Sequence, residues 1–247
     1  MDLTPDPTQL HYNNFLARNY LWMAGGLVEN STKCARFFAG HGIRPAGCGN
    51  AVDLGAGCGF ASLALAALGF RVTAVDFSRP MLTLLAQYAA GLSVQAVNAD
   101  IRNAASWSGH APELITCMGD TLTHLADMGE VKDLIRYCAG ELPAGGKLVL
   151  SCRDYSKEPA GSSVVIPVRR DPDRIFLCRL EYGTTHVHIT DIVFSRESGK
   201  WQRYSSSYTK VRISCTDLIP LLSSSGFVPE VWGNGRDSIT IFCTKPS

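Results

Sequence analysis

The sequence predicts an α/β fold: a doubly wound, mostly parallel sheet, an antiparallel β insertion after the fifth strand, and a helical N-terminal segment. Short apolar runs alternate with helical patterns between residues 50 and 152, which is typical of parallel strands connected by helices. A glycine-rich turn over Asp53–Gly59 joins the first apolar run to the first helix of this series. Between Ser163 and Ile213 no helical pattern is present, and β-type runs take its place.

The first 45 residues are expected to be helical. His11–Met23 carries aromatic side chains along a helical pattern, two glycines interrupt it, and Val28–His41 resumes it. Two interpretations of this segment remain open. Its aromatic residues pack on the sheet, or the segment is a lid over a ligand crevice in which Tyr20 and Trp22 line a substrate pocket.

Residues 46–155 are expected to form the core of a single domain that extends over residues 1–247. Its predicted strands are Ala51–Leu54, Arg71–Val75, Ser93–Val97, Glu113–Met118 and Lys147–Cys152. Helices are expected after the glycine turn, after Ser78 and from Met128 to Leu142. Ser78 is a typical N-cap residue, and Pro80 is tolerated in the first turn of the helix that follows.

The insertion is expected over residues 156–213 and covers the crevice. Its alternating runs are Arg174–Tyr182, His186–Ser195 and Trp201–Ile213, and Glu197–Lys200 forms a turn between the last two. Residues 214–247 supply a final helix, Thr216–Ser225, kinked at Pro220. Two last strands, Pro229–Trp232 and Ser238–Cys243, bring the main sheet to seven.

The composition bounds the class of protein. Of 247 residues, 46% are hydrophobic and 18% charged, which is enough apolar material for a sizeable core, and the net charge of +1 gives no support to a nucleic-acid partner. The N-terminal residues lack the pattern of a secretory signal, and the most apolar stretch, Phe60–Phe70, is too short to cross a membrane. Nine scattered cysteines without zinc spacing are expected to be free thiols in a reducing cytoplasm. No metal is expected, and the chain is expected to be a monomer or a homodimer.

The glycine turn is not the usual dinucleotide-binding loop. That loop has the spacing Gly-x-Gly-x-x-Gly, with its amides facing a pyrophosphate, whereas the glycines here are Gly55, Gly57 and Gly59. Asp53 stands at the end of the preceding strand, where a carboxylate repels a pyrophosphate and suits a cationic amine.

Two further acids follow the next two strands. Asp76 is placed to accept hydrogen bonds from both hydroxyls of an unphosphorylated ribose. Asp100 is placed to accept one from an adenine amino group. Together with Asp53, these acids indicate a nucleoside ligand that carries an amino-acid tail and no phosphate.

These motifs resemble those of the class I S-adenosylmethionine-dependent methyltransferases. The matching stretches are Ala51–Gly59, Val72–Ser78, Ala99–Ile101 and Cys117–Asp120. The resemblance is close over residues 45–155 and looser in the final helix and strands. It implies a Rossmann-like fold, S-adenosylmethionine as the cofactor, and cofactor contacts from Trp22, Asp53, Gly55, Ala56, Gly57, Gly59, Asp76, Phe77, Ser78, Met81, Asp100, Ile101, Cys117, Met118 and Gly119.

The segment after the fourth strand, Cys117–Leu125, resembles that of small-molecule N-methyltransferases of the glycine N-methyltransferase type. Asp120 departs from their usual asparagine, so glycine itself is in doubt as the substrate, and the acid is expected to bind an ammonium or act as a base. His124 is expected to be a base or a substrate contact, or alternatively a helix-start histidine bonded to a backbone carbonyl. Asp120, His124 and Tyr20 are the predicted catalytic residues.

Several residues are candidates for holding the substrate. Arg153 and Tyr155 follow the fifth strand at the rim of the crevice, where Arg153 either clamps a carboxylate or forms a surface ion pair. Tyr204, Tyr208, Lys210 and Arg212 alternate along one strand and share a face, which either lines an anionic or aromatic substrate or is exposed to solvent. The predicted substrate contacts are Tyr12, Arg153, Tyr155, Tyr204, Tyr208 and Arg212.

Methyl transfer from a sulfonium requires that nucleophile and methyl group be held close, aligned and dry, with no demand for a metal. The favoured prediction is transfer to a small molecule, at an amine nitrogen. The alternatives that remain are transfer to oxygen, sulfur or a metalloid, action on RNA, and a non-catalytic role as an S-adenosylmethionine-binding sensor or scaffold.

Overall fold

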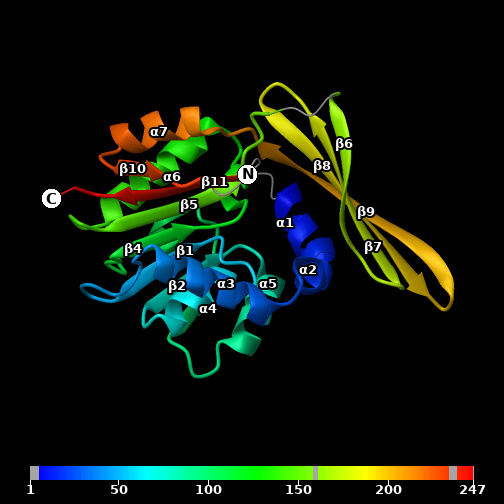
Figure 1. Cartoon of the computed structure of the whole chain (residues 1–247), viewed down its shortest axis with the longest axis horizontal. Coiled ribbons are helices and arrows are strands. Elements are labelled where there is room, and N and C mark those ends of the chain that lie inside the picture. Colours follow the sequence, from blue (N-terminus) through cyan, green and yellow to red (C-terminus); the bar gives the residue numbers. More distant parts are fainter. Residues whose placement is uncertain (1–5, 158–160, 234–237, 247) are drawn as a thin grey trace.

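The computed structural model describes residues 6–157, 161–233 and 238–246, which form a seven-stranded sheet and a separate four-stranded sheet (Figure 1). The strand order of the larger sheet is β10-β11-β5-β4-β1-β2-β3. Its strands are β1 (Asn50–Leu54), β2 (Arg71–Asp76), β3 (Val94–Asn98), β4 (Leu114–Cys117), β5 (Lys147–Arg153), β10 (Val228–Val231) and β11 (Ser238–Thr244). Strands β1 to β5 are parallel, and β11 and β10 complete the sheet in antiparallel fashion. The predicted fold class is confirmed.

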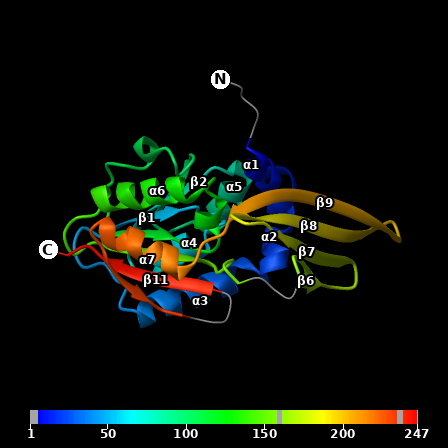
Figure 2. The same cartoon turned by 90° about the horizontal axis from the view of Figure 1, so that it is seen from above.

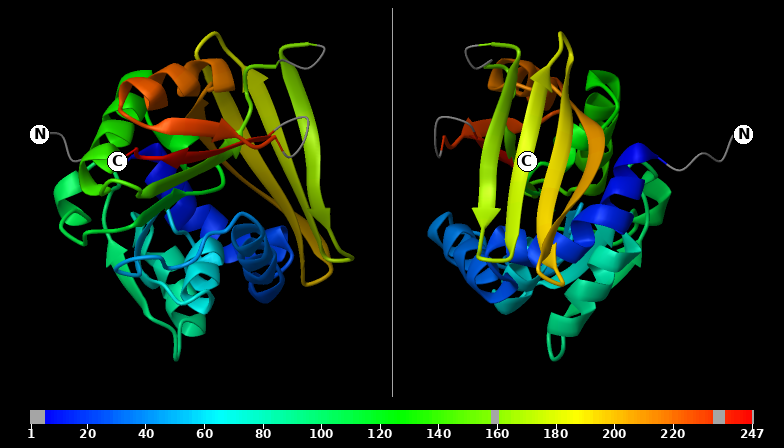
Figure 3. Two further views of the ribbon diagram at one scale, coloured as in Figure 1. Left: turned by 60° about the vertical axis from the view of Figure 1, so that its left-hand side comes forward. Right: turned by 90° about the vertical axis from the view of Figure 1, so that its right-hand side faces the viewer.

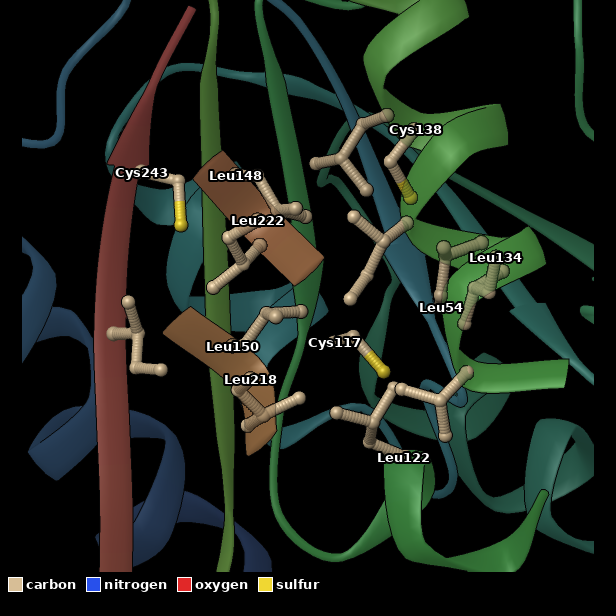
Figure 4. Close-up of a cluster of buried hydrophobic side chains, with 14 of the residues drawn as sticks. Leu54, Cys117, Leu122, Leu134, Cys138, Leu148, Leu150, Leu218, Leu222 and Cys243 are labelled. Carbon is tan, nitrogen blue, oxygen red and sulfur yellow. The ribbon is translucent and has the colours of Figure 1, made fainter. Parts of the chain in front are cut away.

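Helices cover both faces of this sheet. On one face lie α3 (Leu27–Gly40), α4 (Phe60–Ala67) and α5 (Arg79–Tyr88), and on the other lie α6 (Met128–Glu141) and α7 (Cys215–Ser224) (Figure 1). The central strands are nearly continuous apolar runs because both of their faces are buried. Figure 4 shows the larger core, in which strand residues such as Leu54 and Leu150 meet Leu134 of α6 and Leu218 of α7.

Pro220 lies inside α7, which extends from Cys215 to Ser224 as one helix, so no break marks the predicted kink. The helix begins with a capping box, in which the Ser214 hydroxyl and the Asp217 carboxylate each bond the other residue's backbone amide.

The strand order reverses between β1 and β4. In open α/β sheets such a reversal leaves a crevice at the carboxyl ends of the strands, because the flanking connections leave in opposite directions. The loops that follow β1, β2, β3 and β4 therefore meet at one edge of the sheet, and the predicted ligand-binding acids lie in them.

The four-stranded sheet is an antiparallel meander of β6 (Ser163–Arg170), β7 (Arg174–Tyr182), β8 (His186–Glu197) and β9 (Lys200–Val211). It stands beside the carboxyl-end edge of the larger sheet, and the N-terminal helices lie between the two (Figures 2 and 3). One of its faces packs on these helices through Phe176 and Val193, which contact Leu16. The predicted insertion is present, with β6 as a strand that the sequence pattern had not delimited.

The N-terminal segment forms α1 (Pro7–His11), a π-helical turn η1 (Tyr12–Leu16) and α2 (Ala17–Ala24), which ends at Gly25 in the left-handed conformation (φ 89°). The predicted helix His11–Met23 is therefore present, but a π turn interrupts its regular rise. Such turns rotate the side chains that follow and are frequent at functional sites. Within the described ranges, no helix combines the length and the apolar character that crossing a membrane requires.

Candidate active site

A cavity of about 570 Å³ opens at the carboxyl ends of β1 to β4, beneath α1, η1 and α2. Its volume lies within the range of small-molecule and cofactor sites. The predicted site residues that line it are Tyr12, Tyr20, Asp53, Gly55, Ala56, Gly57, Asp76, Phe77, Met81, Asp100, Ile101, Met118, Gly119, Asp120 and His124.

The three glycines of the loop are explained by their surroundings: two are packed closely against side chains, and the third faces open space. A Cβ at Gly55 would lie 2.7 Å or less from three side-chain atoms of Thr121, and one at Gly59 would lie 2.5 Å from Leu85. Gly57, which has a φ of 55°, faces open space, where a Cβ would meet no protein atom within 4 Å. Gly55 and Gly59 thus hold the loop against the core, and Gly57 leaves room for a ligand to approach the backbone.

Asp53 lies in the cavity lining, but both of its oxygens already accept hydrogen bonds. Ser62 donates to Oδ2 at 2.6 Å and Thr116 donates to Oδ1 at 2.8 Å. Burial raises the pKa of Asp53 to about 6, and the two hydroxyls partly offset this. Its carboxylate thus connects β1 to β4 and to α4 by hydrogen bonds. Asp53 therefore has a structural role in addition to the expected one as partner of a cationic amine.

Asp76 has the arrangement expected of a ribose-binding acid. The amide of Gly57 donates to Oδ2 at 2.8 Å, and that of Ser78 donates to Oδ1 at 2.7 Å. Each oxygen keeps acceptor capacity, since an ionised carboxylate accepts about four hydrogen bonds. Burial raises the pKa of Asp76 to about 6. Two hydroxyl donors therefore fit this carboxylate.

Ser78 occupies the N-cap position of α5, but its hydroxyl makes no capping bond. It donates instead to Asn13 Oδ1 at 2.8 Å, and so links the loop after β2 to η1. Gln9 makes a second such link, since its amide donates to the carbonyl oxygen of Phe77 at 3.1 Å. The N-terminal helices are thereby bonded to the loop at which a ribose would lie.

Asp100 is engaged by Arg102 in this structure. The guanidinium donates Nε to both carboxylate oxygens, at 3.0 and 2.9 Å, and the Arg102 amide donates to Oδ1 at 2.9 Å. Burial raises the pKa of Asp100, but the hydrogen bonds and the charge of Arg102 lower it by more, so the pKa lies below its usual value. An adenine amino group must therefore share this carboxylate with Arg102 or displace it, which the sequence pattern did not indicate.

Asp120, predicted to bind an ammonium or act as a base, accepts three hydrogen bonds. The Arg153 amide donates to Oδ1 at 2.7 Å, and Lys210 Nζ and the Tyr155 hydroxyl donate to Oδ2 at 2.5 and 3.3 Å. Burial raises the pKa of Asp120, but the Lys210 ammonium outweighs this and holds it well below its usual range. The carboxylate is ionised, already paired and a weak proton acceptor.

His124 follows Asp120 in the same segment, at the end of the 3₁₀ turn η3 (Thr121–His124). Its Nε2 is 3.0 Å from the Tyr12 hydroxyl, and its ring packs on Tyr208 with centroids 5.4 Å apart. Burial and the positive charge of Lys210 lower the pKa of His124 well below its usual value. The imidazole is therefore neutral at pH 7, and Nε2 accepts a hydrogen bond where Tyr12 donates it.

Tyr20 and Trp22 lie on different sides of α2. Tyr20 stacks on Phe60 in the cavity lining, with ring centroids 5.8 Å apart, and burial raises the pKa of its phenol. Trp22, predicted to contact the cofactor, lies outside the lining and packs under the Arg174 guanidinium, 4.2 Å from its ring centroid. Residues two apart on a helix face nearly opposite directions, so both cannot enter one pocket.

The remaining predicted residues lie behind or away from the lining. Gly59, Ser78, Cys117, Arg153, Tyr155, Tyr204, Tyr208 and Arg212 are outside it. Tyr155 and Tyr208 are buried beside Asp120 and His124, as described above, and Arg212 donates to the carbonyl oxygens of Tyr155, Ser156 and Gly183.

Tyr204 lies inside β9, about 20 Å along the strand from Lys210, and donates a hydrogen bond to Glu197 at the end of β8. The shared face of β9 is therefore buried near the cavity and exposed beyond it. The lining also holds residues that were not among the predicted site residues: Asp6, Thr8, Gln9, Cys34, Cys58, Phe60, Ala61, Asn98, Ala99, Arg102, Thr121, Leu125 and Ser151.

Comparisons with known proteins agree with this geometry. A family model described as a methyltransferase domain matches residues 51–146. A cypemycin N-terminal methyltransferase from Streptomyces sp is 36% identical over 124 residues, which is 49% of this chain and half the length of that relative. A ubiquinone biosynthesis O-methyltransferase from Xanthomonas axonopodis pv. citri (strain 306) is 27% identical over 194 residues, covering 78% of this chain and 71% of the relative. The X-ray structure of the sugar N-methyltransferase KedS8 from Streptoalloteichus sp ATCC 53650 is similar with a TM-score of 0.70 and 16% identity, covering 100% of this chain and 96% of that one.

Proposed function

We propose that the chain is a class I S-adenosylmethionine-dependent methyltransferase that acts on a small molecule, and that its acceptor atom is an amine nitrogen; the methyltransferase-domain match over residues 51–146 and the geometry of the cavity support this. The relatives include one named as an N-terminal methyltransferase and one named as an O-methyltransferase, so the class alone does not select the atom.

The charge of the cavity carries this proposal. Among the described residues, the lining holds one guanidinium, from Arg102, and five carboxylates, from Asp6, Asp53, Asp76, Asp100 and Asp120. Even with the Lys210 ammonium that pairs with Asp120 behind the lining, carboxylates outnumber cations five to two. The rings of Tyr12, Tyr20 and Phe60 line the same space. An excess of carboxylates and the faces of aromatic rings both stabilise a bound cation. An acceptor that arrives as an ammonium is a cation, whereas an acceptor hydroxyl is neutral.

The donor half of the cavity suits S-adenosylmethionine. Asp76 would hold its ribose hydroxyls, the Gly57 backbone would approach its amino-acid tail, and Asp100 with Arg102 would meet its adenine. When bound, the cofactor supplies an electrophilic methyl group on sulfur. The protein's residues then have to orient the acceptor, exclude water and take up a proton.

Tyr12 and His124 are proposed to take up that proton. A protonated amine is not nucleophilic, so one N–H proton must leave before or during transfer. The Tyr12 hydroxyl accepts the ammonium N–H and passes its own proton to Nε2 of His124, which lies 3.0 Å away and is neutral. The imidazole becomes charged, and the ionised Asp120 beside it stabilises that charge.

Transfer to a hydroxyl oxygen is the second candidate, because the O-methyltransferase relative covers more of this chain and a neutral histidine also deprotonates a phenol. A matched pair of acceptors separates the two. We expect purified protein with methyl-labelled S-adenosylmethionine to label an amino sugar or an N-terminal peptide amine, and not the analogue in which a hydroxyl replaces that amine. Labelling of the hydroxyl analogue alone would overturn the assignment to nitrogen.

A further inference from the structure

Lys210 is a buried cation of the insertion that lies behind the cavity lining, where it contacts the lining residue Asp120. It lies near the end of β9 with 5% of its surface exposed. Its Nζ donates to Asp120 Oδ2 at 2.5 Å, and it lies 5.6 Å and 5.8 Å from the ring centroids of Tyr155 and Tyr208. A buried ammonium needs a counter-ion and a favourable surrounding, and Asp120 and the two aromatic faces provide both.

The Lys210–Asp120 pair joins two parts of the fold. Asp120 follows β4 of the seven-stranded sheet, whereas β9 belongs to the four-stranded sheet. The other two donors to Asp120, the Arg153 amide and the Tyr155 hydroxyl, come from the end of β5 and the loop after it. Three segments thus fix one carboxylate, and His124 follows it in the same loop.

We infer that Lys210 is a positioning residue for methyl transfer: it holds the Asp120 carboxylate as a fixed counter-ion, so that His124 and not Asp120 takes the acceptor's proton. The kinetic consequence rests on the proposed function, since it assumes that a proton must leave the acceptor. The contact itself, and its effect on folding, do not rest on that function.

The charges around His124 determine the sign of the effect. Tyr12 faces its ring from η1, His11 lies close on α1, Tyr208 and Lys210 face it from β9, and Asp120 lies in its own loop. Asp191 of β8 is paired with His11, 3.2 Å from its Nε2. Lys210 disfavours the imidazolium and Asp120 favours it, so removing Lys210 alone raises the pKa of His124, and removing both charges leaves burial to keep it low.

The kinetic test is Lys210→Met, with Lys200→Met at the exposed start of the same strand as the matched control. With the labelled amine of the paired screen as acceptor, we expect the acid limb of kcat to move to higher pH by about one unit or more in Lys210→Met. Lys200→Met should leave it unchanged. The double variant Asp120→Asn/Lys210→Met should return the limb toward its wild-type position. An acid limb that stays in place in Lys210→Met would overturn the inference.

An activity-free measurement keeps the inference testable if the acceptor is not an amine. In the wild type the pKa of Asp120 is lowered, so this group stabilises the fold above the pKa of an unfolded aspartate, about 3.9, and loses that contribution as the pH falls. In Lys210→Met the same carboxylate is buried without its counter-ion, which raises its pKa and destabilises the fold as the pH rises.

The thermal midpoint of Lys210→Met should therefore fall increasingly below that of the wild type between pH 4 and pH 7. In Asp120→Asn/Lys210→Met neither charge remains, so the difference in midpoint should no longer grow with pH. If Lys210→Met alone fails to fold, this double variant should still fold. A difference in midpoint that is constant over this range would overturn the pairing of Lys210 with Asp120.

Discussion

Asp76→Ala is expected to weaken S-adenosylmethionine binding at least tenfold. The variant removes two charge-assisted hydrogen bonds to the ribose, each worth about 1.5–3 kcal/mol. It also releases the amides of Gly57 and Ser78, which the carboxylate holds at 2.8 and 2.7 Å, so the glycine loop loses an anchor. Titration calorimetry measures the affinity. Asp133→Ala, at an exposed position of α6, is the control and should bind as the wild type does.

The affinity should also depend on pH through this group. Without ligand, burial raises the pKa of Asp76 to about 6, and hydroxyl donors from a ribose lower it. Binding is then favoured by the ionised form, and the dissociation constant should rise as the pH falls below about 6 and be constant well above it. An unchanged affinity in Asp76→Ala at pH 7.5 would contradict the ribose assignment.

His124→Asn is expected to lower kcat by a factor on the order of 10² to 10³, which is the contribution typical of a positioned proton acceptor. The amide fills a similar space but takes up no proton, and the affinity for S-adenosylmethionine should change by less than about twofold. Tyr12→Phe should lower kcat less, because a proton can pass to His124 directly. Steady-state kinetics with saturating cofactor measures both variants.

His188→Asn, on the exposed side of β8, is the matched control and should retain wild-type kcat. If His124→Asn keeps kcat within about threefold of the wild type, the acceptor arrives deprotonated and needs no base from the protein. The role proposed for Tyr12 and His124 would then be wrong, and the cofactor assignment would stand.

The donor half of the site could be predicted because its information is local in sequence. A carboxylate directly after a parallel strand must lie at the carboxyl edge of the sheet, and Asp76 does so with the contacts that a ribose-binding acid needs. Asp53 and Asp100 lie at the same edge, but their partners Ser62, Thr116 and Arg102 are set by side-chain geometry that strand order does not specify.

The acceptor half depends on contacts between distant segments. Lys210 and Asp120 are 90 residues apart in the sequence. Lys210 belongs to β9 of the four-stranded sheet, whereas Asp120 follows β4 of the seven-stranded sheet, and no periodicity in the sequence indicates that they meet. The π-helical turn at Tyr12 and the helical offset between Tyr20 and Trp22 decide which aromatic residues reach the cavity. The sequence predicts that Asp120 binds an ammonium or acts as a base, and the ammonium that it contacts in the structure is that of Lys210, from a distant strand.

Identifying the atom that receives the methyl group is the most direct test of the proposed function. A metabolite extract incubated with the protein and S-adenosylmethionine carrying a ¹³C-methyl group yields a labelled product, and the carbon shift and mass of that product identify the methylated atom. We predict a methyl group on nitrogen, absent when Asp76→Ala replaces the wild type at limiting cofactor. A ¹³C-methyl group found on oxygen or sulfur in the wild-type product would contradict the account.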